Sequence, residues 1–191
     1  MNILHVIDQL SLTHGGGAAM VTYQLAEAQA RLGHNVTIAT TDWHMNGQKP
    51  PEGVKVKAYH YNFSPFGLRV SLGMMSALLP RKHIVHLHNY RTFANWCYGG
   101  AATVLEAHGS MPTSKPWLDT LAWKPSVFSN AKRYIANSEL EIPQYEAQGA
   151  KRKEIAVIPP GIDWREFETL PQRNTKPYKT VLYLGRIHPV K

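Results

Sequence analysis

The sequence predicts an α/β fold, an open and mostly parallel sheet of about seven strands with helices on both faces. Short β-branched runs alternate with longer segments whose apolar residues recur at helical spacing. Glycine and proline stand at most of the transitions between these segments. Apolar residues make up 43% of the 191 residues, which is enough to bury a core. Together these features predict layers of helices packed against a central sheet.

The first 41 residues set the pattern. Residues 3–7 form a compact β-branched run, and residues 11–17 form a loop that contains three consecutive glycines. Residues 18–31 have apolar side chains at helical spacing, and Gly33 lies where a helix would end. Residues 35–41 form the next strand. This order predicts a βαβ unit with a right-handed crossover between parallel strands.

The remaining elements continue the alternation. The expected strands cover residues 54–61, 84–88, 103–107, 134–137 and 155–158. The expected helices cover residues 68–79, 92–99 and 139–148, and Pro125 is expected to break or kink further helical material. Ligands of such sheets bind in the loops that follow the carboxyl ends of the strands, so those loops are the candidate site.

The end of the chain suggests a second domain. Residues 168–179 are polar with two prolines, and residues 180–184 form a good strand with little sequence after it. We therefore expect residues 1–167 to form one domain, 168–179 to be an interdomain linker and 180–191 to begin a domain that is otherwise absent. A strand at the edge of the first domain is the alternative.

The charge balance points to an anionic partner. Lysine and arginine total 21 against 13 acidic residues, which gives a net charge of +8. Such a surplus is typical of proteins that bind nucleic acid, phosphorylated substrates or acidic membranes, and a solvated basic surface is the alternative. No helix-turn-helix, RNP, KH or zinc-finger pattern is present, so we expect no nucleic acid partner.

The single cysteine, Cys97, excludes a disulfide framework and a thiolate zinc site, and it fits a reducing compartment. Its aromatic, apolar surroundings favour a buried structural thiol over a nucleophile. The N-terminus lacks the basic start and cleavage site of a signal peptide. We therefore expect a cytoplasmic protein, with peripheral contact at the inner face of the membrane as an open alternative.

Histidines lie near two strand ends. His108 follows an expected strand directly, where either ring nitrogen could donate to a phosphate or a sugar hydroxyl. His86 and His88 are two residues apart on one strand, so both should face the same side. That spacing can bind a metal ion, but Asn89 and Glu106 are weak candidates for a third ligand. We therefore predict no metal site, and histidines of the core or its rim.

Two further patterns suit an anion. His14, Gly15, Gly16 and Gly17 lie between a strand and a helix N-terminus, where unpaired amides and the helix dipole favour negative charge. A tight turn without a ligand is the alternative there. Near the end of the chain, an arginine directly follows a strand and a lysine comes five residues later, a pair that suits a diphosphate: Arg186 and Lys191.

Taken in order, these segments resemble the N-terminal half of a GT-B glycosyltransferase of the large retaining family 4. The resemblance runs along essentially the whole chain, through residues 2–6, 15–18, 31–36, 84–88, 104–109, 134–138, 155–163 and 182–191. It implies two Rossmann-like domains with the active site between them, the N-terminal one holding mainly the acceptor and the C-terminal one a nucleotide-sugar donor. It also implies that residues 180–191 are the first strand and phosphate loop of the donor domain. The family's Glu-x7-Glu motif would lie beyond Lys191, so we expect this chain alone to be inactive.

The resemblance also implies roles for residues. His108 matches the active-site histidine that contacts the donor sugar. The residues that approach or neutralise the donor phosphates are Gly15, Gly16, Gly17, Arg186 and Lys191. The acceptor-side candidates are His14, His88, Asn89 and Ser138. Glu106 departs from the family, since many members have Thr or Ser there, and Pro160 replaces a common asparagine.

The implied reaction is transfer of a hexosyl group with retention, from a UDP- or GDP-sugar substrate to a sugar, a lipid-linked or a polyanionic acceptor. We expect no cofactor and no metal ion, because the two cations would stabilise the leaving diphosphate. The competing hypothesis is a non-catalytic α/β module that binds an anionic ligand or a partner.

Overall fold

A computed structural model of the chain describes residues 1–12, 16–42, 48–65, 68–75, 84–101, 103–109, 117, 119–162 and 168. One compact unit covers Met1–Pro160. A second unit, Gly161–Lys191, lies almost wholly outside the described residues. The predicted domain limits, the linker over 168–179 and the phosphate loop over 180–191 therefore stay predictions.

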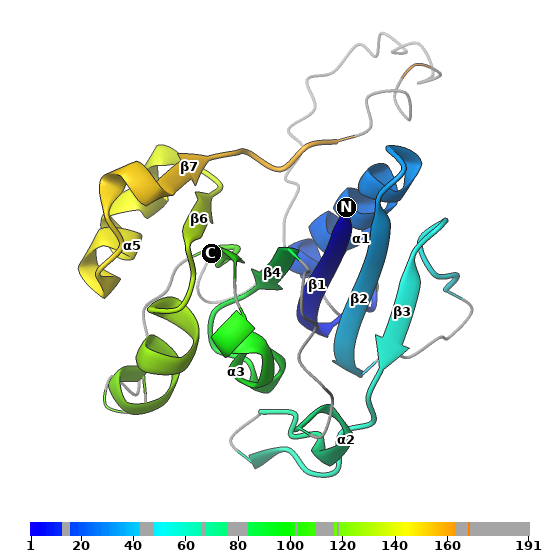
Figure 1. Cartoon of the computed structure of the whole chain (residues 1–191), viewed down its shortest axis with the longest axis horizontal. Helices are drawn as coiled ribbons and strands as arrows, with labels where there is room; N and C mark the ends of the chain where they lie inside the picture. The colour runs from blue at the N-terminus through cyan, green and yellow to red at the C-terminus, as the bar shows by residue number, and fades with distance from the viewer. Residues whose placement is uncertain are drawn as a thin grey trace, which may run out of the picture. The chain divides into compact units, whose positions relative to one another are not determined.

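The first unit is built on a seven-stranded sheet in the order β3-β2-β1-β4-β5-β6-β7 (Figure 1). Every pair of neighbouring strands is parallel, which confirms the predicted fold class. The strands are β1 (Asn2–Gln9), β2 (Asn35–Asp42), β3 (Lys55–Ala58), β4 (Ile84–His88), β5 (Val104–Glu106), β6 (Arg133–Ala136) and β7 (Ile155–Val157). The strand order reverses between β1 and β4, and in open α/β sheets such a switch point forms the ligand crevice.

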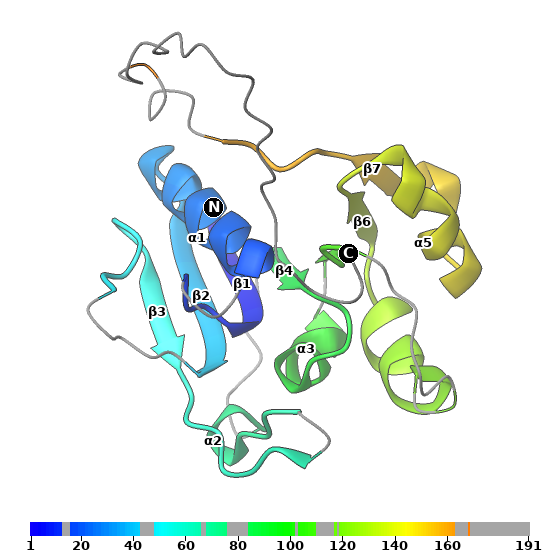
Figure 2. The same cartoon turned by 180° about the vertical axis from the view of Figure 1, so that it is seen from behind.

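Helices cover both faces of the sheet. Helix α1 (Gly16–Arg31) lies in front of β1 and β2 in Figure 2. It packs on the face that includes Ile3 and Ile7, in a small core with Ala19 and Ala26. The opposite face packs against α3 (Phe93–Tyr98), a π-helix η3 (Asp119–Phe128) and α5 (Ile142–Gln148).

The second face holds the larger core. Leu4, Val6, Val85, Leu87 and Leu105 alternate with residues of the α1 face along their strands, as the period of a β-strand requires. The partly buried thiol of α3 packs against this core, and burial raises the pKa of that thiol, Cys97, to about 11. An inert structural cysteine is therefore the better description.

Several predicted boundaries are wrong by one or more residues. Helix α1 begins at Gly16, so part of the expected glycine loop belongs to its first turn. In the described part of the predicted helix over 68–79, only the turn α2 (Leu72–Met75) is helical. The predicted helix over 139–148 divides into a 3-10 turn η4 (Glu139–Glu141) and α5. Two further 3-10 turns are η2 (Gly99–Ala101) and η5 (Arg152–Glu154).

Of the two predicted effects of Pro125, a break or a kink, the break does not occur. Pro125 lies inside the π-helix η3. Proline lacks the N–H that an α-helix needs and clashes with the carbonyl four residues earlier, whereas π-turns pair residues five apart and interrupt that ladder. The wider turn therefore accommodates the ring. Among the described residues, no helix is long and apolar enough to cross a membrane.

Candidate functional site

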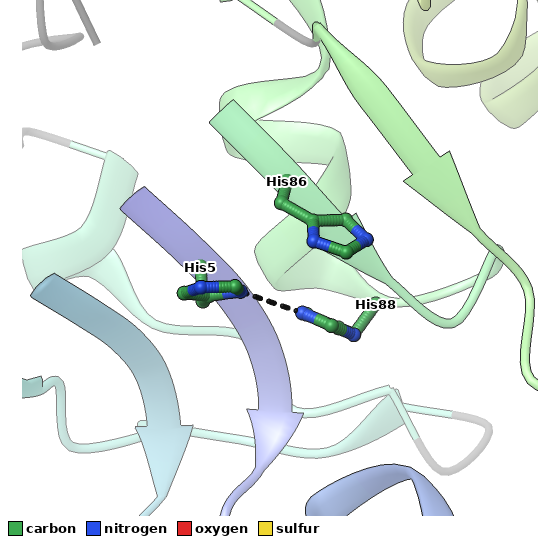
Figure 3. A group of neighbouring side chains, drawn as sticks. All are labelled: His5, His86 and His88. Atoms are coloured by element: carbon green, nitrogen blue, oxygen red, sulfur yellow. Dashed lines mark hydrogen bonds between the residues drawn. The ribbon is translucent and has the colours of Figure 1, made fainter. Parts of the chain in front are cut away.

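A cluster of buried polar side chains lies across the switch point. In the register of the sheet His5 of β1 pairs with His86 of β4, and His88 pairs with Glu106 of β5. Because alternate residues of a strand share a face, all four side chains lie on the α1 face. Figure 3 shows the three imidazoles from β1 and β4 gathered together. The register alone therefore brings these groups into contact.

The imidazoles of His5, His88 and His108 form one chain of hydrogen bonds. Oε1 of Gln29, on α1, lies 2.7 Å from Nε2 of His5. Nδ1 of His5 lies 2.8 Å from Nε2 of His88, the dashed line in Figure 3. Nδ1 of His88 in turn lies 2.7 Å from Nε2 of His108. At the far end, Nδ1 of His108 lies 3.3 Å from Oε1 of Glu106. The chain thus connects helix α1 to the carboxyl end of β5.

The carboxyl group of Glu106 is surrounded by histidines. Its Oε2 lies 3.2 Å from Nε2 of His86 and 3.8 Å from Nδ1 of His88. The ring centroids of His86 and His88 are 4.1 Å apart. The 3.2 Å contact with Glu106 lacks the angles of a hydrogen bond, so the buried Nε2 of His86 has no hydrogen-bond partner among the described residues. His86 therefore packs against the hydrogen-bonded chain without joining it.

Burial keeps these imidazoles neutral. Burial, together with the nearby His86, lowers the pKa of His5 to about 3, and burial lowers the pKa of His86 to about 4. Burial and the other histidines hold the pKa of His88 well below its usual value. Burial also lowers the pKa of His108, against the opposing effect of Glu106. Burial raises the pKa of Glu106, so the carboxyl group favours its protonated form.

The backbone at the two strand ends is left-handed at residues other than glycine. Asn89 has φ 64° and His108 has φ 51°. Such conformations are uncommon for residues other than glycine, although Asn and His adopt them more often than most, and they cluster at functional sites. The Asn95 side chain supports the first turn, because its Nδ2 donates to the carbonyl of His88 at 2.8 Å and also to that of Asn89.

A tyrosine from α5 holds the second strand end in place. Oη of Tyr145 accepts a hydrogen bond from the N–H of Ala107 at 2.8 Å and donates to the carbonyl of Ile135 at 2.7 Å. The tyrosine therefore ties β5 to β6 at the residue before His108. Packing from the apolar face thus fixes the backbone of the site.

The structure brings together only some of the predicted site residues. His88 and His108 are in direct contact, and Asn89 is the next residue along the chain. Gly16 and Gly17 lie in the first turn of α1, exposed and with open space where a Cβ would point. Within the described part of the chain, these glycines and Ser138, which follows β6, stay outside the histidine cluster. The predicted residues outside the described part are His14, Gly15, Arg186 and Lys191.

Sequence reasoning missed the other half of the cluster. The sequence pattern indicates neither His5 nor Gln29, and it gives Glu106 only as a weak candidate for a metal ligand, whereas the structure places Glu106 at the centre of the cluster. The sequence does indicate that His86 and His88 share one face of their strand and that His5 lies in the middle of the first strand. Only the register shows that these faces coincide.

Two groups of side chains have the composition of metal sites. They are His5 with His86 and His88, and His88 with Glu106 and His108. The view that the histidines of β4 lack a third partner is therefore wrong. Two nitrogens bound to one zinc ion would lie about 3.3 Å apart, whereas the linked imidazole nitrogens lie 2.7 and 2.8 Å apart. Those distances are typical of hydrogen bonds, and the absence of a metal site stays a prediction.

Comparison with known proteins identifies relatives of this chain. The family model described as Glycosyltransferase Family 4 matches residues 15–165. A crystal structure of a glycosyltransferase from Rickettsia africae ESF-5 is similar, with a TM-score of 0.55 and 19% sequence identity. The match covers 89% of this chain and 46% of that chain, so this chain spans about half the length of that protein. At such identity the likeness concerns the fold. No curated protein sequence matches the chain.

Proposed function

Because the chain belongs to Glycosyltransferase Family 4, we propose that it is the acceptor-side part of an enzyme that transfers a hexosyl group, with retention, from a UDP- or GDP-sugar. The observation that most supports this proposal is the polar cluster at the switch point, which ends at the left-handed His108 on the carboxyl edge of the sheet. Ligands of open α/β sheets bind at this edge.

The N-terminus of α1 supports an anionic group at the same edge. It follows the carboxyl end of β1, Gly16 and Gly17 have open space where a Cβ would point, and the first amides of a helix have no partner within the helix. Amides and dipole together stabilise a phosphate there. Gly15 and His14, which precede this turn, are proposed to belong to the same binding loop.

His108 meets a ligand only by exchanging a contact, since both of its ring nitrogens already face protein groups. The contact with His88 is short, 2.7 Å, and the contact with Glu106 is longer, 3.3 Å. We therefore propose that the donor sugar replaces Glu106 at Nδ1. Asn89, which follows β4, and Ser138, which follows β6, are proposed to face the acceptor. His88 is buried with both ring nitrogens bonded to other histidines, so it holds His108 in place and does not itself meet the acceptor.

The leaving diphosphate needs positive charge. Arg186 and Lys191 are proposed to neutralise it, as a bidentate cation and a point charge. The net charge of +8 suits a lipid-linked or polyanionic acceptor, or contact with an acidic membrane surface. With those two cations in place, the proposed transfer uses no metal ion and no cofactor.

The test measures nucleotide release from a panel of UDP- and GDP-sugars by the 191-residue chain and by the full-length protein of which this chain is proposed to be the acceptor-side part. His108→Ala and Arg186→Ala are the test variants, and His60→Ala, at an exposed histidine, is the matched control. We expect release from one donor by the full-length protein, lost in both test variants and kept in the control. We expect no release from the 191-residue chain.

A second candidate is a non-catalytic module that binds an anionic ligand. The engaged and buried ring of His108 favours it, because a ring with both nitrogens in use needs no substrate. It predicts no release from any donor, together with a melting temperature that inorganic phosphate raises. Release that survives in both test variants would instead contradict the proposed site residues.

A further inference from the structure

We propose that Gln29 fixes, through His5 and His88, which ring nitrogen of His108 carries hydrogen, so that His108 offers Nδ1 as a hydrogen-bond acceptor. The identity of the ligand as a sugar rests on the proposed function, whereas the fixed tautomer does not. In this proposal Gln29 and His5 are positioning residues, since neither reaches the carboxyl edge where a ligand would bind.

The side-chain amide of Gln29 sets which atom donates in each hydrogen bond from Gln29 to His108. Oε1 of Gln29 is a carbonyl oxygen and can only accept, so Nε2 of His5 must donate to it across 2.7 Å. A neutral imidazole has one donor and one acceptor nitrogen, so Nδ1 of His5 accepts, and Nε2 of His88 donates to it across 2.8 Å. The tautomer of one ring therefore fixes the tautomer of the next ring.

The same rule applies at the last link. Nδ1 of His88 is left as an acceptor, so Nε2 of His108 donates to it across 2.7 Å. Nδ1 of His108 then has a lone pair and no hydrogen. A lone pair accepts from a hydroxyl and repels a phosphate oxygen, so this nitrogen recognises a hydroxyl of a sugar rather than a phosphate.

Glu106 lies beside Nδ1 of His108, at the end of the hydrogen-bonded series opposite Gln29. Its Oε1 lies 3.3 Å from Nδ1 of His108. A carboxylate there would place two lone pairs face to face, whereas a protonated carboxyl group donates to the ring. Burial raises the pKa of Glu106, which favours that protonated form. In the unliganded site, the hydrogen of the Glu106 carboxyl group therefore makes the hydrogen bond to Nδ1 of His108 that a ligand hydroxyl would make.

The opposite direction would give a different specificity. If the Gln29 amide were reversed, its Nε2 would donate to His5, and each ring would then donate from Nδ1. His108 would donate to an ionised Glu106, or to a phosphate in its place. The two directions therefore assign His108 to two chemical classes of ligand, and they differ by one hydrogen at Glu106.

Imidazole ¹⁵N NMR spectra of the 191-residue chain at pH 7 distinguish the two directions. We expect hydrogen on Nε2 of all three rings, together with ¹⁵N–¹⁵N couplings across the hydrogen bonds from His5 to His88 and from His88 to His108. Hydrogen on Nδ1 of His108, or on both of its nitrogens, would overturn the proposal in the natural sequence without any variant.

Substitutions at Gln29 test whether it sets the direction. An ionised carboxylate can only accept, so Gln29→Glu in its ionised form should leave the tautomer of His108 unchanged. Gln29→Lys can only donate, and it should move the hydrogen of His108 from Nε2 to Nδ1. Gln24→Glu, at an equally half-buried position of the same helix, is the matched control. Gln29→Leu, which offers His5 no partner, should give a mixture of tautomers at His108.

A His108 tautomer that stays the same in both Gln29→Lys and Gln29→Leu would show that Gln29 does not set it. These outcomes are independent of transfer. If the tautomers are as expected but no nucleotide sugar is cleaved, the proposed function fails and the fixed tautomer stands. If a donor is cleaved but His108 has hydrogen on Nδ1, the transferase stands and this inference fails.

Discussion

The two faces of the same strands differ in kind. On the α3 face, β4 and β5 place Val85, Leu87 and Leu105 in a continuous apolar core. On the α1 face, the alternate residues of these strands are His86, His88 and Glu106, equally buried but polar. Burying polar groups costs free energy unless hydrogen bonds replace water, and one of the three, His86, has a ring nitrogen with no hydrogen bond. Apolar packing on the α3 face therefore stabilises the fold. The polar side chains on the α1 face are not needed for packing, which is consistent with a functional role.

The polar face should make the protein sensitive to acid, which is the largest effect we expect. Burial holds the pKa of His5 near about 3 and that of His86 near about 4, and the pKa of His88 lies well below its usual value. Below pH 6.5 the unfolded chain binds protons on these imidazoles and the folded chain does not. The free energy of unfolding should therefore fall by about 1.4 kcal/mol per pH unit for each histidine, which is about 4 kcal/mol per pH unit for the three together.

Glu106 acts in the opposite direction. Burial raises its pKa, so the folded chain keeps a proton that the unfolded chain has released above pH 4.5. That contribution to stability is present at low pH and is lost as the pH rises through the raised pKa. Urea unfolding between pH 7 and pH 4.5 measures the net slope. Equal midpoints across that range would contradict the neutral, buried state of the cluster.

The apolar face should respond to truncation instead. Leu87→Ala removes a fully buried side chain from the centre of the sheet, and it should lower the free energy of unfolding by about 3 kcal/mol. Urea unfolding at pH 7 gives the value. Because no titrating group is touched, the slope of stability against pH should equal that of the natural sequence. A changed slope would mean that the two faces are not independent.

Two histidines on the polar face should respond in opposite ways to the same substitution. His88→Leu leaves Nδ1 of His5 and Nε2 of His108 without their partners, and it should cost about 2 kcal/mol. His86→Leu removes a nitrogen that has no hydrogen bond, and it should stabilise the chain by about 1 kcal/mol. It should also reduce the slope of the free energy of unfolding against pH by the contribution of one proton, about 1.4 kcal/mol per pH unit.

Paired urea unfolding curves of these two variants give both values. Equal losses would mean that the rings act as filler and that their hydrogen bonds contribute nothing. The comparison needs only this chain, since neither result depends on a donor or an acceptor.

Much of the fold could be predicted from the sequence because it follows from local patterns. The alternation of β-branched runs with helical periodicity gave seven parallel strands, and all seven lie where these runs occur. The helix is not broken at Pro125 because a π-turn tolerates proline, and nothing in the local pattern predicts that turn.

The site was less predictable, because its geometry depends on register. His88 and His108 follow from their places at strand ends. The contact of His5 with His88, and the central place of Glu106, depend on which residues of neighbouring strands lie side by side. Gln29 joins them from a helix, at a distance that periodicity does not fix. Local sequence therefore predicted the edge of the sheet, and only the tertiary structure gave the connections.

The packing of the apolar face can be tested where two elements meet. A Cβ at Gly99, just after α3, would lie 2.1 Å from the carbonyl oxygen of Ser126 in the π-helix, so the backbone would have to move. The neighbouring Gly100 has open space in the same direction. Neither has a positive φ. Gly99→Ala should therefore cost about 2 kcal/mol, whereas Gly100→Ala should change little. If thermal or urea unfolding gave equal stabilities for the two variants, α3 and the π-helix would not be in close contact, and the apolar face would be looser than its burial indicates.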